Sequence, residues 1–356
     1  MKSLVAAVDL RNDRIEAVQK ACELIGGIND IDVPDRELVV KVGVFTPAKG
    51  WYSTVDTVSG ILHSFRHTPK KYIVETDNYQ GGGMERLQIW KQLFSDNVVP
   101  VNLSQDPDTT AIRVPNPIRE VIINLSKLVL KPRVFVDTHV MRSYERGSIL
   151  KNLFGLTPTA KKVQYHKSEI FYSLLTTLYE AIGGIDLAVL DATYFTHSFK
   201  EKSASVQTDV LLVGKDAVAV ETIGLHLAGI DVRKNELIKS FVEKGLGAGS
   251  LDSIDVVGMS MAKLEERFAE ARRECETKMS KIQGAWSPSK ATDDLIASGF
   301  FKSPKRRTMD EIVDALAKKD SRAGGRDKMI YTNVRRRVEK GKLHGEKVEK
   351  EMVYWT

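Results

Sequence analysis

Short runs of Val, Ile and Leu alternate with amphipathic stretches along the first 260 residues. The apolar runs lie at residues 4–10, 37–42, 71–75, 99–103, 120–125, 187–190, 210–213 and 254–257. Helical periodicity fills most of the gaps, at 14–25, 54–65, 84–94, 169–182 and 217–227. Strands that alternate with helices of this length are typical of βαβ units. We therefore predict an α/β body with a mostly parallel sheet that is covered on both faces.

One stretch interrupts this pattern. Residues 105–119 contain three prolines and show no periodicity. They are expected either to link two α/β lobes or to form a long surface loop.

Polar residues stand at the ends of several predicted strands, where open α/β sheets place their binding sites. Lys41 ends one strand, and Asp77 ends another before Gly81, Gly82 and Gly83. The glycines could bring backbone amides to an anion at a helix N-terminus, or could simply make a tight turn. Asp191 and Asp216 also follow predicted strands.

Residues 120–166 are richer in basic and amide side chains. These candidate ligand-binding residues are Asn124, Lys127, His139, Lys151, Asn152 and His166. Lysine and histidine drawn to one cleft suit a phosphate or carboxylate ligand. Each of them alone could equally be a structural or surface group. No spacing of His, Cys, Asp or Glu points to a metal, so we expect neither a metal nor a cofactor.

Several motifs occur in an order that resembles a known family. They are INLSKL at 123–128, a Thr-His pair at 138–139, LKNLFG at 150–155, LAVLDA at 187–192, LLVGKDAVAVET at 211–222, AGID at 228–231 and GLGAGSLDSIDVVG at 245–258. Over residues 35–258 the chain is similar to domain-of-unknown-function family 362. The resemblance implies an α/β fold and implies no settled activity. Many members carry ferredoxin-type clusters, for which the two cysteines of this chain, Cys22 and Cys275, are too few.

The body, expected to end at residue 258, is followed by a helical segment at 259–284. Its apolar stripe is Met261, Leu264, Phe268, Ala271, Cys275, Met279 and Ile282, at spacings of three and four. Such a stripe packs either on the body or on a second copy, because three heptads can support a coiled-coil dimer.

All of the net charge lies in the last 72 residues. Residues 285–356 hold 17 Lys and Arg against 11 Asp and Glu, whereas residues 1–284 hold 36 of each. The segment has a capping box at Thr308–Glu311, three helical patterns and a hairpin at 342–355. This order resembles winged helix-turn-helix modules of archaeal type.

A basic face on such a module indicates nucleic-acid binding. The candidate contacts are Lys328, Thr332, Asn333, Arg335, Arg336, Arg337, Lys342 and Lys347. A protein-docking module with a solvated basic face is the alternative.

Three functions remain open at this point. The first is a nucleic-acid-binding protein, such as a transcriptional regulator, whose body binds a small anionic ligand. The second is an enzyme that acts on a phosphorylated or carboxylated metabolite, with the basic module docking a partner. The third is a purely structural or ribosome-associated factor. No apolar stretch approaches the roughly 18 residues that cross a membrane, and two cysteines suggest no disulfide framework. We expect a cytoplasmic protein that does not bind membranes.

Overall fold

The computed structural model describes residues 2–115, 121–197, 204–283, 287–302, 304–319, 327–349 and 351–356. The chain divides into two compact units, Met1–Glu276 and Thr277–Thr356. Each unit is considered by itself. Within the described ranges, no helix combines the length and apolar character needed to cross a membrane.

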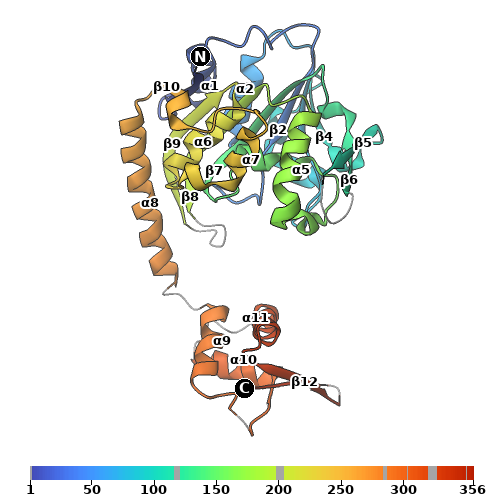
Figure 1. The fold of residues 1–356 in the computed structure, drawn as a ribbon, viewed down its shortest axis with the longest axis vertical. Coiled ribbons are helices and arrows are strands. Elements are labelled where there is room, and N and C mark those ends of the chain that lie inside the picture. Colours follow the sequence, from blue (N-terminus) through green and yellow to red (C-terminus); the bar gives the residue numbers. More distant parts are fainter. Residues whose placement is uncertain are drawn as a thin grey trace. The chain divides into compact units, whose positions relative to one another are not determined.

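The first unit is built on one eight-stranded sheet (Figure 1). The strand order is β10-β1-β9-β8-β7-β2-β3-β4, and every neighbouring pair is parallel except the two pairs that involve β9. The strands are β1 (Ser3–Asp9), β2 (Leu38–Val42), β3 (Lys71–Glu75), β4 (Val98–Asn102), β7 (Val134–Ser143), β8 (Leu187–His197), β9 (Ser205–Gly214) and β10 (Ile254–Gly258). The prediction of a mixed α/β fold around a mostly parallel sheet is confirmed.

Helices cover both faces of this sheet, because its strands bury side chains on both sides. On one face Val39, Phe135 and Leu190 pack with α5 (Ser168–Ala181), α6 (Ala217–Leu227), α7 (Glu236–Val242) and α8 (Met261–Gln283). On the other face Val40, Val136 and Val189 pack with α1 (Arg14–Leu24) and α2 (Val55–Ser64), and with Leu87 of α3 (Gly83–Leu87). Consecutive strand residues thus enter opposite cores, as the strand period of two requires.

The two-lobe expectation is wrong for this unit. The strands β4 and β7, which precede and follow residues 105–119, belong to the same sheet. Residues 109–114 form β5 (Thr109–Val114), which pairs with β6 (Val121–Ser126) in a separate two-stranded antiparallel sheet. The predicted strand at 120–125 is therefore outside the main sheet. Residues 116–119 of the same segment lie outside the described residues.

The stripe of the long helix α8 packs on the first unit. Leu264, Phe268, Ala271 and Cys275 are at most 3% exposed and join its core. A dimer seam through these positions is thus not available, because the seam is already buried within one chain. The side chains of Met279 and Ile282 lie outside the described residues. The boundary between the two compact units, after residue 276, therefore lies within α8.

After the end of α8, the described residues of the second unit form three helices and a three-stranded antiparallel sheet. In chain order these are α9 (Pro288–Ala297), β11 (Arg307–Thr308), α10 (Met309–Lys319), α11 (Asp327–Glu339), β12 (His344–Val348) and β13 (Glu351–Trp355). Its core contains Leu295, Phe301, Ile312, Leu316, Ile330, Val334, Leu343 and Tyr354. The expected capping box is present, since Glu311 N donates to Thr308 Oγ1 at 3.3 Å and Thr308 N donates to Glu311 Oε2 at 3.0 Å.

Candidate functional site

Charged side chains are concentrated at the carboxyl edge of the sheet, at the ends of β2, β3 and β7. The segment between β7 and α5, residues 144–167, folds back onto this edge. It includes the short helix α4 (Ile149–Asn152) and the 3-10 turns Leu153–Leu156 and Lys162–Tyr165. Asn152 contacts β2 and β7, and Lys162 reaches the residue after β3. The chain thereby closes over the place where open α/β sheets keep their ligands.

A buried network of charges lies under this segment, and Lys41 and Glu75 are at its centre. Lys41 is fully buried, and its Nζ is 2.7 Å from Glu75 Oε2, 2.8 Å from the carbonyl oxygen of Val42 and 3.1 Å from Asn152 Oδ1. On its other side, Glu75 Oε1 is 2.7 Å from Arg86 Nη2. Burial alone would raise the pKa of Glu75, but Lys41, Arg86 and Lys162 together hold it below its ordinary value.

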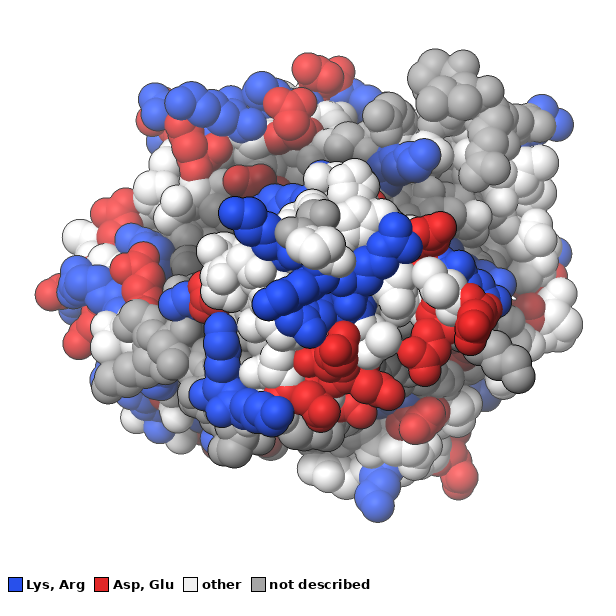
Figure 2. Space-filling view, turned by 90° about the horizontal axis from the view of Figure 1, so that it is seen from below, with Lys and Arg blue, Asp and Glu red and all other residues white. Residues whose placement is uncertain are grey.

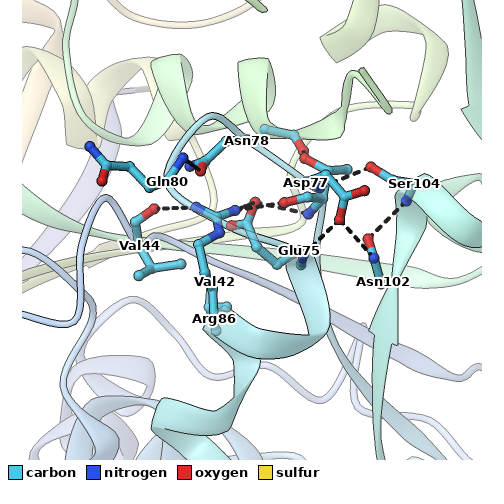
Figure 3. Close-up of polar contacts among 12 residues, drawn as sticks. Val42, Val44, Glu75, Asp77, Asn78, Gln80, Arg86, Asn102 and Ser104 are labelled. Atoms are coloured by element: carbon cyan, nitrogen blue, oxygen red, sulfur yellow. Dashed lines mark hydrogen bonds and ion pairs between the residues drawn. The ribbon is translucent and has the colours of Figure 1, made fainter. Parts of the chain in front are cut away.

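Arg86 ties two loops to this carboxylate (Figure 3). Its Nη1 donates to the carbonyl oxygen of Val44 at 2.9 Å, and its Nη2 donates to that of Thr76 at 2.6 Å. Sequence reasoning missed Arg86 because it lies on the short helix α3, away from any predicted strand end.

Asp137 is the second buried carboxylate of the network. Its Oδ1 accepts from Asn152 Nδ2 at 2.7 Å, while its Oδ2 has no hydrogen-bond partner among the described residues. Burial raises the pKa of Asp137 to about 8, against the opposing influence of Lys41 and Asn152. The side chain is therefore mostly protonated at neutral pH.

Lys162, on the 3-10 turn that precedes α5, is the last member of the network. Its Nζ donates to Thr76 Oγ1, which donates to the carbonyl oxygen of Gly155. A Cβ on Gly155 would lie 2.7 Å from both Cε and Nζ of Lys41, so the backbone approaches the lysine too closely for any side chain. We call Lys41, Glu75, Arg86, Asp137, Asn152 and Lys162 the buried charge network. All six members are buried, so the network is a framework of the fold.

A second group of basic side chains lies beside this network, and all of its members except the buried Arg142 are partly exposed. It consists of His139, Arg142, Arg146, Lys151 and His166, which we call the basic cluster. Three members were predicted from the sequence, whereas Arg142 and Arg146 were not. The missed signal is a pair of arginines, Arg142 near the end of β7 and Arg146 just beyond it.

Arginine–aromatic contacts order the basic cluster. The guanidinium of Arg142 lies 4.8 Å from the ring centre of Trp51 and 5.4 Å from that of Phe45. That of Arg146 lies 4.6 Å from the ring of Phe171. Arg146 Nη1 is also 3.3 Å from His166 Nδ1. Such stacking holds the guanidinium groups in place without neutralising them.

Lys151 is the member whose protonation is most altered. Burial, with Arg142 and Arg146 nearby, lowers the pKa of Lys151 to about 7. Its Nζ lies 4.3 Å from the centre of the Tyr144 ring. Burial together with Arg142 and Lys151 lowers the pKa of His139 well below its ordinary value, so this imidazole is neutral near pH 7.

Glu221 of α6 supports the same segment from below. Its carboxylate accepts from the backbone N–H of Ser148 at 2.9 Å and of Leu150 at 2.8 Å. Burial raises the pKa of Glu221 to about 7 in spite of these bonds. Glu221 thus fixes the start of α4, which carries Lys151 and Asn152.

Two amides of the glycine run after β3 are engaged within the protein, that of Gly81 by the carbonyl oxygen of Asn78 and that of Gly83 by Asp77. Asp77 Oδ1 accepts from Gly83 N at 2.7 Å and from Asn102 Nδ2 at 2.8 Å, and Asp77 N donates to Ser104 Oγ (Figure 3). The carboxylate of Asp77 occupies the place that an anion would take. Asp77 is therefore a structural residue beside the site.

Asn124 and Lys127 lie away from both clusters. Asn124 is exposed on β6, and exposed Lys127, just after β6, forms an ion pair with Asp108 at 2.7 Å. The alternation of buried and exposed residues along β6 is typical of a half-exposed hairpin. This alternation was a signal that the strand is not internal to the main sheet.

Asp191 and Asp216 are structural as well. Asp191 accepts from Thr54 N at 2.7 Å and from Thr193 N at 2.9 Å, and so holds the start of α2. Asp216 caps α6 and accepts from Ser3 Oγ at 2.6 Å. Because β9 runs antiparallel, its end lies at the amino edge of the sheet, opposite the basic cluster.

In the second unit, α11 divides the predicted nucleic-acid contacts into two groups. Thr332, Arg335 and Arg336 are exposed, as are Lys342 and Lys347 beyond the helix. Figure 2 shows Lys and Arg side chains gathered beside Asp and Glu side chains on one face of the molecule. The side chain of Lys328 lies outside the described residues.

Arg337 does not belong to the exposed group. It is 8% exposed and its guanidinium donates to Asp293 Oδ2 at 2.6 Å and to Ser289 Oγ at 2.8 Å. It also donates to Asn333 Oδ1 at 3.1 Å, so Asn333 is engaged too. Arg337 therefore joins α11 to α9, whereas Asn333 is bonded within its own helix.

Comparisons with known proteins add a family match and a distant structural likeness. No curated protein matches the chain. A crystal structure of a protein from Thermotoga maritima is similar at 11% identity and a TM-score of 0.37, covering 61% of this chain. The chain spans 58% of the length of that protein. Residues 85–226, which include β7 and the whole basic cluster, match the family described as Domain of unknown function (DUF362).

Proposed function

We propose that the protein binds nucleic acid through a C-terminal winged helix-turn-helix module and that its α/β body binds a small anionic ligand. The observation that carries the nucleic-acid proposal is the division of α11 into two faces. Ile330 and Val334 are buried in the core of the unit, whereas Thr332, Arg335 and Arg336 are exposed on the same helix. A winged helix-turn-helix protein places its third helix in the major groove with this polarity.

The hairpin of β12 and β13 supports the same proposal. All five residues of β12 are exposed, as are Lys342 and Lys347, and Lys342 Nζ also lies 4.0 Å from Asp293 Oδ1. The ring of Trp355 on β13 lies 5.7 Å from that of His344 and 4.7 Å from the Arg306 guanidinium. A hairpin of this kind reaches the phosphate backbone or the minor groove.

Fluorescence anisotropy with the full chain, on a mixed-sequence duplex and on a structured RNA, tests this proposal. Arg336→Ala is expected to weaken binding, whereas the matched variant Lys290→Ala, which removes an exposed cation from α9, should change it little. Equal losses from both variants would indicate attraction to charge alone. Absence of binding to both nucleic acids at low salt would contradict the proposal and favour a protein-docking module.

The anion proposal for the body depends on the basic cluster. Arg142, Arg146 and Lys151 bring three basic groups together at the carboxyl edge of the sheet, and Glu221 is the acidic group whose attraction opposes the lowering of the pKa of Lys151. Inorganic phosphate or a dicarboxylate should raise the melting temperature by binding the native state. Lys151→Gln should remove this shift. Lys127→Gln, which removes a lysine from the exposed hairpin, should retain it.

An enzyme of unknown reaction that acts on a phosphorylated or carboxylated metabolite is the second candidate. The observation that favours it is that Lys151 and Glu221, whose charges influence one another, both have pKa values moved to about 7 by burial. Groups that exchange protons near neutrality are common in active sites. Proton NMR of a metabolite mixture, with and without the protein, would reveal consumption of a substrate.

A further inference from the structure

We propose that Lys151 forms an imine with an anionic carbonyl compound, of the 2-oxo acid class, whose carboxylate is received by Arg142. This inference rests on the anion binding proposed for the body and names the chemical class of its ligand.

The position of Lys151 suits a nucleophilic amine. The residue is on α4, partly exposed at the carboxyl edge, with Nζ against the Tyr144 ring. An amine attacks a carbonyl only in its uncharged form, and desolvation or neighbouring cations supply that form at neutral pH. Both influences act on Lys151, whose pKa is lowered to about 7 by burial and by Arg142 and Arg146.

Arg142 supplies the anion-binding group. Its side chain is buried and stacked on Phe45 and Trp51, and Nη2 makes a long contact of 3.4 Å with the carbonyl oxygen of Trp51. Its Nε has no hydrogen-bond partner among the described residues. A buried guanidinium nitrogen without a partner is costly. A carboxylate, which accepts two parallel hydrogen bonds from arginine, would satisfy it.

The chemical step is balanced without any further reactant. Nζ of neutral Lys151 attacks the carbonyl carbon, and a carbon–nitrogen bond forms as the carbonyl π bond breaks. The resulting carbinolamine loses its hydroxyl with a proton as one water molecule, and the carbon–nitrogen double bond of the imine remains. No group is oxidised or reduced.

Lys162 provides an internal contrast. Burial lowers the pKa of Lys162 to about 7 as well, yet the residue is only 8% exposed, and its Nζ donates to Thr76 Oγ1 within the buried charge network. Both lysines therefore have a lowered pKa, and they differ in their exposure to solvent, since Lys151 is partly exposed and Lys162 is buried. The proposal requires reaction at Lys151 and none at Lys162.

Reductive trapping with the full chain tests the inference. The protein is incubated with pyruvate or 2-oxoglutarate and sodium cyanoborohydride, and the modified lysines are located by peptide mass mapping. We expect a dominant adduct on Lys151, its loss in Lys151→Arg, a weaker adduct in Arg142→Lys, and an unchanged adduct in Lys161→Arg. Modification spread evenly over surface lysines, or found on Lys162, would overturn the inference.

Wild-type mapping decides the question even if a variant does not fold. A parallel melting experiment without reductant separates this inference from the proposal on which it rests. If phosphate or the 2-oxo acids raise the melting temperature but no adduct forms on Lys151, imine formation is wrong and anion binding stands. If neither effect is seen, both are wrong.

Discussion

The two units of this chain carry charge in opposite ways. The second unit has an excess of six positive charges over residues 285–356, and its basic side chains on α11 are mostly exposed. Residues 1–284 have no net charge, yet Lys41, Glu75, Arg86 and Asp137 are buried at one edge of a sheet. The net charge of the sequence therefore indicated the exposed basic side chains of the second unit. It gave no sign of the buried charges in the first unit.

The comparison predicts that charges in the body are essential to stability, whereas those on α11 are not. Glu75→Gln is the strongest test, because it leaves Lys41 and Arg86 buried without a carboxylate. We expect a loss of about 3–5 kcal/mol in the free energy of unfolding, as for other broken buried pairs. Urea denaturation followed by tryptophan fluorescence measures it.

The matched control for this change is Glu37→Gln. Glu37 accepts from Arg133 Nε at 2.8 Å and from Tyr72 OH at 3.0 Å, with about a third of its side chain exposed. Its loss should cost less than about 1 kcal/mol. Equal costs at Glu75 and Glu37 would show that burial does not distinguish the two pairs.

The protonation of Asp137 predicts a pH dependence. Burial raises its pKa to about 8, so the native state holds a proton that the unfolded chain releases near pH 4. Its contribution to stability therefore falls as pH rises from about 4 to 8, by at most about 1.4 kcal/mol for each pH unit. Asp137→Asn does not ionise, so its stability relative to wild type should increase from pH 5 to 8 and then level off. A constant difference across this range would contradict a protonated Asp137.

Within the second unit, substitution of Arg337 should lower stability, whereas substitution of Arg336 should weaken nucleic-acid binding and leave stability unchanged. Arg337→Ala removes charged hydrogen bonds to Asp293 and is expected to cost about 1.5–3 kcal/mol. Calorimetry of the full chain would show a lower transition for that unit. Arg336→Ala should leave this transition in place, since its side chain is exposed.

The smallest expected effect is on the salt dependence of nucleic-acid binding. Removing one phosphate contact at Arg336 should reduce the slope of log K against log salt by about 0.9 on duplex DNA. Anisotropy titrations at several salt concentrations measure this slope. An unchanged slope with weaker binding would place Arg336 against a base and not against a phosphate.

The sequence predicts most of the sheet because the fully apolar strands stand out. Residues 71–75 are found as a strand with the observed ends, and β2 and β10 differ by one residue at most. The central strand β7 escapes because Asp137, Thr138 and His139 interrupt its apolar run. Asp137 and His139 are also members of the candidate site. The polar side chains that β7 contributes to the site are therefore the reason that its sequence does not look like a buried strand.

The site was predicted in part for a similar reason. Lys41 was expected at a strand end, and it lies at the carboxyl edge of β2. Lys151 and Asn152 were named only because residues 120–166 are rich in polar side chains, and the structure brings both to the same edge on α4. Asp216 could not be placed, because strand direction is set by pairing between β1, β8 and β9, which are distant in sequence. Periodicity reports which residues are buried but not which way a strand runs.

The place of β1 in the sheet has a consequence for how the chain is made. The partners of β1 are residues 210–213 of β9 and 254–258 of β10. At about 5–20 residues per second, the first of these leaves the ribosome roughly 10–40 s after β1. During that time an apolar strand with both edges unpaired waits in the cell, which makes it a natural site for a chaperone and for aggregation.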